Sequence, residues 1–181
     1  MALDPSRRSL LRLGLAGSAV LAVGGIGLSL RPPVAVPSPG PLRVFSAREH
    51  SICAAIADTM CPGGVGLPTA TELGVAAKLD ALLSTVHPGV GKEIRQVLHL
   101  MENPLAALAF DGRLTPFSHL SAADRATALE LWRTSSLGVR RQAYKGLHGL
   151  INAAYWGDPR TYGHGGYPGP PDYGNRPGAT P

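Results

Sequence analysis

Apolar residues recur at helical spacing through the middle of the chain, and polar capping patterns mark where the helices begin. The first such pattern is Ser-Ala-Arg-Glu at residues 46–49, where the Ser46 hydroxyl can accept a free backbone N–H and Glu49 can reach back to Ser46. The Pro-Gly-Gly sequence at residues 62–64 is a stop signal. Between these signals the apolar side is formed by Ile52, Ile56 and Met60. The pattern predicts a helix that starts after Ser46 and ends before Pro62.

Two further segments show the same periodicity. A second capping box, Thr-Ala-Thr-Glu at residues 69–72, is expected to open a helix that His-Pro-Gly at residues 87–89 ends. The apolar positions of this segment are Leu73, Ala76, Leu79, Leu83 and Val86. Residues 92–102 follow and stop at Asn103-Pro104, with Ile94, Val97, Leu98 and Met101 on one side.

The last two predicted helices lie on either side of residue 137. Residues 117–120 are expected to form a loop into a helix that Ser121 caps, with Asp124 in its first turn and Leu129 and Trp132 facing inward. The final helix covers residues 140–156, with Tyr144, Leu147, Ile151, Ala154 and Tyr155 near one face. No segment alternates convincingly as a strand does. The sequence therefore predicts an all-α fold, a small helical domain of about five helices.

The composition changes sharply at Gly157. The prolines and glycines of residues 157–171 cannot continue a helix, so an irregular Gly/Pro/Tyr-rich tail is expected. Six of the ten aromatic residues lie within residues 144–173, and tyrosines among glycine and proline offer contact area at low side-chain entropy cost. Two interpretations stay open: the tail docks a partner, or it folds back over the core of its own domain. For docking, we expect the contact residues to be Tyr155 and Trp156 at an exposed helix terminus, then Asp158, Pro159, Tyr162, Gly166, Tyr167, Pro168, Gly169 and Pro170.

The amino-terminal region has the pattern of a twin-arginine export signal. A paired arginine precedes a glycine-rich apolar run at residues 13–30, as in signals read by the translocase that exports folded proteins. The matching positions are Ser6, Arg7, Arg8, Leu10, Leu11 and Arg12. The alternative is an ordinary basic flank on a transmembrane helix, since the positive-inside bias also places arginines there.

Removal of this signal is not evident from the sequence. No small-residue A-x-A triplet follows residue 30, and prolines crowd every candidate cleavage site. The apolar run has 18 residues, just long enough to cross most of a bilayer core of about 30 Å. An uncleaved anchor followed by a stiff proline-rich spacer therefore stays open. The expected organisation is a signal or signal-anchor with its spacer at 1–40, a helical domain at 41–156 and a docking tail at 157–181.

The charge balance and the lack of known catalytic or metal-binding motifs limit the classes of function that the sequence supports. Without residues 1–40 the chain keeps 13 basic and 11 acidic residues, so its basicity lies mainly in the signal and no nucleic-acid partner is expected. No catalytic, metal-binding or phosphate-binding motif is found, which predicts a non-enzyme without a cofactor. Cys53 and Cys61 belong to no CxxC or haem-attachment motif. Each is either a buried free thiol or, for Cys61, a pairing site for a partner's cysteine.

Several of these segments resemble one family. The chain is similar to the small, third (gamma-type) subunit of flavin-dependent gluconate 2-dehydrogenase and of related membrane-associated sugar and alcohol dehydrogenases. The similarity covers residues 45–170. Besides the twin-arginine start, the segments that carry it are 45–49 (Phe-Ser-Ala-Arg-Glu), 56–63 (Ile-Ala-Asp-Thr-Met-Cys-Pro-Gly), 120–125 (Leu-Ser-Ala-Ala-Asp-Arg), 154–159 (Ala-Tyr-Trp-Gly-Asp-Pro) and 166–170 (Gly-Tyr-Pro-Gly-Pro). The chain departs from the family at Cys61, where an aliphatic residue is expected, and at Tyr162, where tryptophan is expected.

The resemblance implies an accessory role in the periplasm. The small subunit holds no cofactor; it binds a large FAD-dependent flavoprotein of the glucose-methanol-choline type, assists its maturation and carries the export signal for both. A cytochrome c subunit is a further candidate member of such a complex. Two other classes stay open: a free-standing exported binding or scaffold protein, and an enzyme whose site is assembled from dispersed residues.

Overall fold

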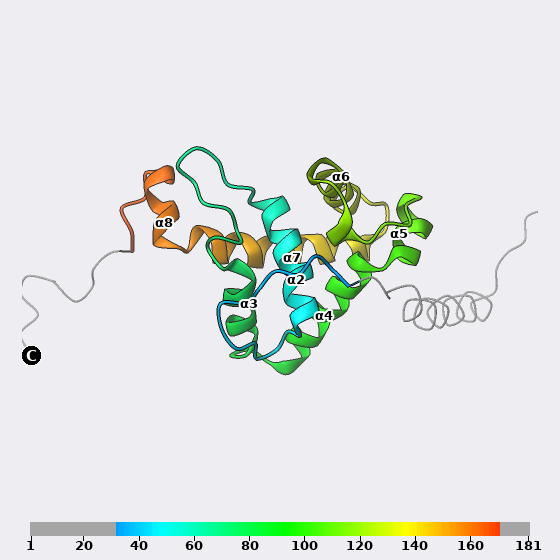
Figure 1. The fold of residues 1–181 in the computed structure, drawn as a ribbon, viewed down its shortest axis with the longest axis horizontal. Helices are drawn as coiled ribbons and strands as arrows, with labels where there is room; N and C mark the ends of the chain where they lie inside the picture. The colour runs from blue at the N-terminus through cyan, green and yellow to red at the C-terminus, as the bar shows by residue number, and fades with distance from the viewer. Residues whose placement is uncertain (1–31, 171–181) are drawn as a thin grey trace, which may run out of the picture.

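The computed structural model describes residues 32–170, and these form a helical domain (Figure 1). Within this range there are seven α-helices and two short 3₁₀ turns, and the one β contact is an isolated bridge between Gly64 and Leu67. The elements are α2 (Ala47–Met60), α3 (Val75–Leu83), α4 (Pro88–Glu102), α5 (Pro104–Asp111), η1 (Phe117–His119), α6 (Ala122–Arg133), α7 (Gly138–Trp156), α8 (Pro159–Tyr162) and η2 (Gly163–Gly165). The predicted all-α class is confirmed for these residues. The predicted signal or anchor lies outside them.

Helix α2 is the centre of the core. Every residue from Glu49 to Ala57 is buried, so the helix is covered on all sides by its neighbours. The predicted capping box at its start is present: the Ser46 hydroxyl accepts the Glu49 N–H, and the Glu49 carboxylate accepts the Ser46 N–H at 2.7 Å. Figure 1 shows α7 running along the long axis of the molecule and crossing α2. Helix α7 buries Leu147, Ile151 and Tyr155, spaced four residues apart as predicted.

The second capping box forms, but it does not open a helix directly. Thr69 and Glu72 exchange the expected hydrogen bonds, with the Thr69 N–H donating to the Glu72 carboxylate at 2.7 Å. The turn they make ends at Gly74, whose φ of +64° interrupts the helical path. Helix α3 therefore begins only at Val75, five residues later than the box alone suggests.

Two signals read as helix ends are also helix starts, so the helix expected from residue 92 begins earlier and one further helix follows it. The His87 Nδ1 accepts the Gly89 N–H and Pro88 is the first residue of α4. Asn103 accepts the Leu105 N–H at 2.8 Å, and α5 begins at Pro104. Proline favours the first helical position because that residue has no intrahelical N–H bond to lose. Helix α5 was missed for this reason.

The proline-rich segment is not a free spacer in its described part. The Val36 N–H donates to the Ser51 hydroxyl and the His50 ring donates to the Val36 carbonyl, so the chain lies along α2. Further on, the buried Asp80 of α3 accepts three consecutive backbone N–H groups, from residues 43–45, at 2.6–2.8 Å. Residues 32–45 thus pack on the helices, including the described part of the segment expected to be a spacer.

Candidate functional site

Helix α7 ends at Gly157, and the sequence encodes both the stop and the turn that follows. A Cβ atom at Gly157 would lie 2.7 Å from the Ala153 carbonyl oxygen, so only glycine fits without a shift. Asp158 then caps a new helix by accepting the Arg160 N–H at 2.9 Å, with Pro159 as its first residue. The short helix α8 results. The expected irregular tail is therefore helical over residues 159–165 and irregular only after that.

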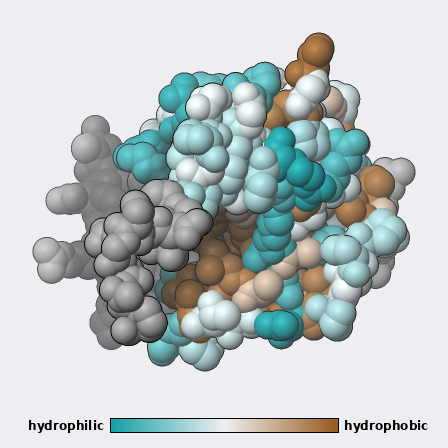
Figure 2. Space-filling model, turned by 90° about the vertical axis from the view of Figure 1, so that its left-hand side faces the viewer, coloured by the Kyte–Doolittle hydropathy of each residue, from teal (hydrophilic) through white to brown (hydrophobic). Residues whose placement is uncertain are grey.

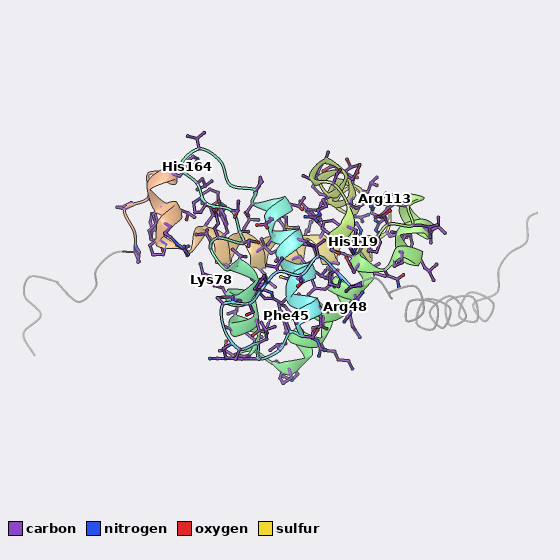
Figure 3. The ribbon with its side chains drawn as sticks, in the orientation of Figure 1. Phe45, Arg48, Lys78, Arg113, His119 and His164 are labelled. Carbon is purple, nitrogen blue, oxygen red and sulfur yellow. The ribbon has the colours of Figure 1, made fainter. Side chains whose placement is uncertain are left out.

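Asp158 also clamps this turn to the body of the domain. Its carboxylate is almost fully buried and meets the Lys78 ammonium of α3 at 2.5 Å and the Arg160 guanidinium at 2.9 Å. Hydrogen bonds from Arg160 and then from Lys78 hold the pKa of Asp158 well below its usual range. Thr161 is fully buried beside it and donates its hydroxyl proton to the Asp158 carbonyl. Figure 3 shows Lys78 on the face of α3 that is turned toward the orange helix.

Tyr155 lies in the core, which corrects the expectation that it stands at an exposed helix terminus. Its side chain is 1 % exposed, and its hydroxyl donates to the Pro68 carbonyl at 2.6 Å. Burial raises the pKa of Tyr155. The hydrogen bond ties the glycine-rich loop at residues 61–74 to α7, and Arg160 donates to the Glu72 carbonyl of the same loop. The tail thus partly covers its own core, one of the two interpretations left open by the sequence.

Other residues at this end are exposed. Trp156 is 45 % exposed, Tyr167 is 48 % exposed and Val65 at the tip of the loop is fully exposed. Tyr162 is half-buried, and its ring meets that of Tyr167 edge to face at 5.0 Å. We call these four residues the α8 surface. Figure 2 looks onto this end of the molecule and shows apolar residues gathered in a hollow beneath a more polar rim.

The remaining predicted contact residues surround the α8 surface. Pro159, Gly166, Pro168 and Pro170 are exposed, whereas Gly169 is half-buried and packs 3.8 Å from the Tyr162 ring. The Tyr167 N–H donates to the Tyr162 carbonyl at 3.0 Å, which folds the segment back on itself. The structure therefore gathers the predicted residues at one end of the domain, with Tyr155 and Asp158 beneath the surface rather than on it.

Sequence reasoning missed three residues of this site. Val65 could have been found, because a large apolar residue between two glycines in a loop signals an exposed tip. Lys78 and Thr161 have no local signal, since their roles depend on the way α7 and α8 pack on α3. A groove of about 400 Å³ adjoins this end, between residues 36–39, the turn at 70–76 and Arg160.

Two further histidines make hydrogen bonds within the described domain, and both cysteines are buried in it. His99 donates to Glu49 at 2.8 Å, and His119 donates to the Pro32 carbonyl at the same distance. No group of three or more metal-ligating side chains occurs in residues 32–170. Cys53 and Cys61 are both buried and free, as the first of the two interpretations expected. Burial raises the pKa of the Cys53 thiol to about 12 and that of Cys61 to about 11.

Comparison with known proteins identifies no relative of this chain. No family model matches the chain, and no curated protein or solved structure is significantly similar to it. Within residues 32–170, none of the helices is both long and apolar enough to cross a membrane. The export-signal residues Ser6 to Arg12 lie outside the described residues.

Proposed function

We propose that this chain is a non-catalytic small subunit that exports a large FAD-dependent dehydrogenase and docks it through the α8 surface. The partner is a flavoprotein of the glucose-methanol-choline type that travels folded through the twin-arginine translocase to the periplasm. The observation that carries the docking half is the exposure of Trp156, Tyr167 and Val65 at the end of the domain where Asp158 clamps α8 to the body.

The clamp matters because interfaces gain affinity when their anchors are held in place before binding. Aromatic side chains are enriched among the residues that dominate binding energy. Tyr167 leans on Tyr162, and the Trp156 ring meets the buried Tyr155 ring edge to face at 5.1 Å while its N–H donates to Asn152. Little side-chain entropy is then lost on docking.

Point variants test the docking half better than a truncation after Trp156. Such a truncation would remove Asp158 and the buried Thr161, and would damage the fold as well as the surface. The variant Trp156→Ala with Tyr167→Ala should abolish co-purification of the flavoprotein and its yellow flavin absorbance. Leu131→Ala is the matched control, because Leu131 is similarly exposed, at 40 %, but belongs to α6, away from the α8 surface.

The export half has its own test. Changing Arg7 and Arg8 to Lys should leave both this chain and the flavoprotein in the cytoplasm, since the paired arginines are the strongest export signal in the sequence. A flavoprotein that still reaches the periplasm in this variant contradicts the carrier role.

A second function is favoured by the groove of about 400 Å³ beside α8. A free-standing exported binding protein could hold a small ligand there, between apolar residues such as Val36 and Leu73 and the cationic Arg160. Tagged protein purified from its native host separates the two proposals. A stoichiometric yellow partner supports the small subunit, whereas a colourless monomer supports the binding protein.

A further inference from the structure

A second exposed surface lies at the opposite end of α7 from α8. Large apolar side chains there are 42–70 % exposed, on α5, on the loop after it and at the start of α7. They are Leu108, Phe110, Leu114, Leu137 and Val139, and we call them the α5 face. An exposed cluster of this kind on a soluble domain usually marks a contact with a protein or a membrane.

Buried charged groups hold the α5 face together. The Arg140 guanidinium lies over the Phe110 ring at 5.1 Å and over the Trp132 ring at 4.8 Å. Its Nη2 donates to one Asp111 oxygen at 2.9 Å, and Arg113 donates to the other at 3.0 Å. Helix α5, the following loop and the start of α7 therefore form one rigid surface, although its apolar side chains contact solvent.

The described chain begins at the same end. The Pro32 carbonyl accepts a hydrogen bond from His119 in η1, and Phe117 of η1 lines a small cavity together with Phe110 and Arg140. Figure 1 shows the start of the chain, in blue, on the side of α4 and α5, with α8 at the far end. In Figure 3, His119 and Arg113 lie in the same half of the molecule.

The distance along the chain from Pro32 to the apolar run is short. Only Arg31 separates the run at residues 13–30 from Pro32, and two residues span at most about 7 Å. Because residues 32–45 are packed on the domain, they provide no spacer. If the run stays in a bilayer, the end of the domain near Pro32 must lie against the bilayer surface.

We propose that residues 13–30 are retained as an anchor and that the α5 face rests in the headgroup region of the inner membrane. The proposal depends on the export half of the proposed function and not on the flavoprotein. Charge favours a lipid surface over another protein: residues 134–157 contain no acidic residue, and Arg141 and Lys145 near the start of α7 are exposed. Basic side chains near anionic lipids contribute attraction, and apolar side chains next to them enter the interface. With the α5 face on the membrane, the α8 surface points away from it.

Fluorescence depth measurements on the full chain test this proposal. The chain is reconstituted in vesicles of phosphatidylethanolamine and phosphatidylglycerol, with an environment-sensitive thiol dye at Val139→Cys. Val65→Cys is the matched control, because residue 65 is fully exposed at the α8 end. Cys53 and Cys61 are buried, so the dye should react with the introduced thiol alone.

The dye at position 139 should emit at shorter wavelength, lose intensity to doxyl-labelled lipids and resist quenching by iodide in the buffer. The dye at position 65 should show the reverse. Equal iodide quenching at the two positions overturns the proposal. Shielding from iodide at position 139 without doxyl quenching also overturns it, because a second protein copy would then cover the face. Recovery of an exported chain that lacks residues 1–31 overturns it as well. None of these outcomes affects the co-purification test of the flavoprotein.

Discussion

The two ends of α7 differ in the sign of their buried charge and in the kind of side chain that is left exposed. At the α8 end a buried carboxylate, Asp158, is held by two cations, and the side chains left exposed are mainly aromatic. At the α5 end a buried guanidinium, Arg140, is held between aromatic rings, and the side chains left exposed are mainly aliphatic. In both cases a buried charge holds together a surface whose exposed side chains lie outside the core. The difference in the exposed side chains matches the proposed partners, a protein at one end and a lipid surface at the other.

The largest change in stability is expected when the buried charge of Arg140 at the α5 end is removed. Arg140→Ala should lower the free energy of unfolding by about 3 kcal/mol, because it leaves the buried Asp111 with Arg113 alone and opens space between the Phe110 and Trp132 rings. Urea unfolding of the full chain in mild detergent, followed by circular dichroism, measures this. The neighbouring exposed Arg141→Ala should change stability by no more than about 0.5 kcal/mol. Similar losses for the two variants would show that Arg140 does not organise this end.

At the α8 end the corresponding variant should have a smaller effect. Asp158→Ala removes the cap of α8 and both ion pairs, and we expect a loss of about 1–2 kcal/mol. The ion pairs add less than the cap because Lys78 and Arg160 are partly exposed, where water and salt screen them. Asp158→Asn keeps an acceptor for the Arg160 N–H and should lose about half as much in the same assay. A loss at Asp158→Asn equal to that at Asp158→Ala would place the energy in the charge and not in the cap.

The helices were predictable where a local signal decides them. Ser46 and Ser121 lie directly before helical segments, and each side chain accepts an N–H from three residues later, as predicted. Prolines were less informative, because the same residue that stops one helix can start the next. Pro88 and Pro104 show this, because α4 and α5 begin at them. Only the capping residue Asn103 before Pro104 is a local sign of a start.

The surfaces were predictable only in part. The change in composition at Gly157 located the α8 end correctly, but it could not show that Tyr155 points inward. That orientation depends on the Pro68 carbonyl, 87 residues earlier in the sequence. The Asp158–Lys78 pair spans 80 residues in the same way. The segment up to residue 40 read as a spacer because the docking of residues 32–45 depends on Ser51 and Asp80. Nothing in the sequence shows that these two side chains accept backbone N–H groups from that segment.

The pH dependence of stability tests whether the ion pairs of Asp158 stabilise the fold. Its pKa is lower in the folded chain than the value of about 3.9 expected when unfolded, so its contribution is complete above that value and is lost as the pH falls toward the folded pKa. The difference in unfolding free energy between the wild type and Asp158→Asn should therefore be constant above about pH 5 and shrink below about pH 4. Other carboxylates with lowered pKa values, such as Glu49 and Asp80, cancel in this difference. A difference that does not change with pH would contradict the ion-pair clamp.

The smallest change in stability is expected at Tyr155, a core residue directly next to the exposed Trp156 of the docking surface. Tyr155→Phe removes one hydrogen bond and leaves the Pro68 carbonyl without its partner, so stability should fall by about 1 kcal/mol. Hydrogen exchange should become faster in residues 61–74 and stay unchanged in α5. Tyr162→Phe is the control, because its hydroxyl bonds the exposed Gly157 carbonyl, which water can satisfy.

Docking should respond differently from stability in these variants. Because Tyr155 is buried, Tyr155→Phe should still co-purify with the flavoprotein, whereas Trp156→Ala should weaken the complex by at least about 2 kcal/mol, a factor of about 30 in affinity. Titration of purified flavoprotein onto each variant measures the two affinities. If Tyr155→Phe loses the partner as fully as Trp156→Ala does, the order of the loop at residues 61–74 carries the interface. The aromatic side chains at the end of α7 would then be supports rather than anchors.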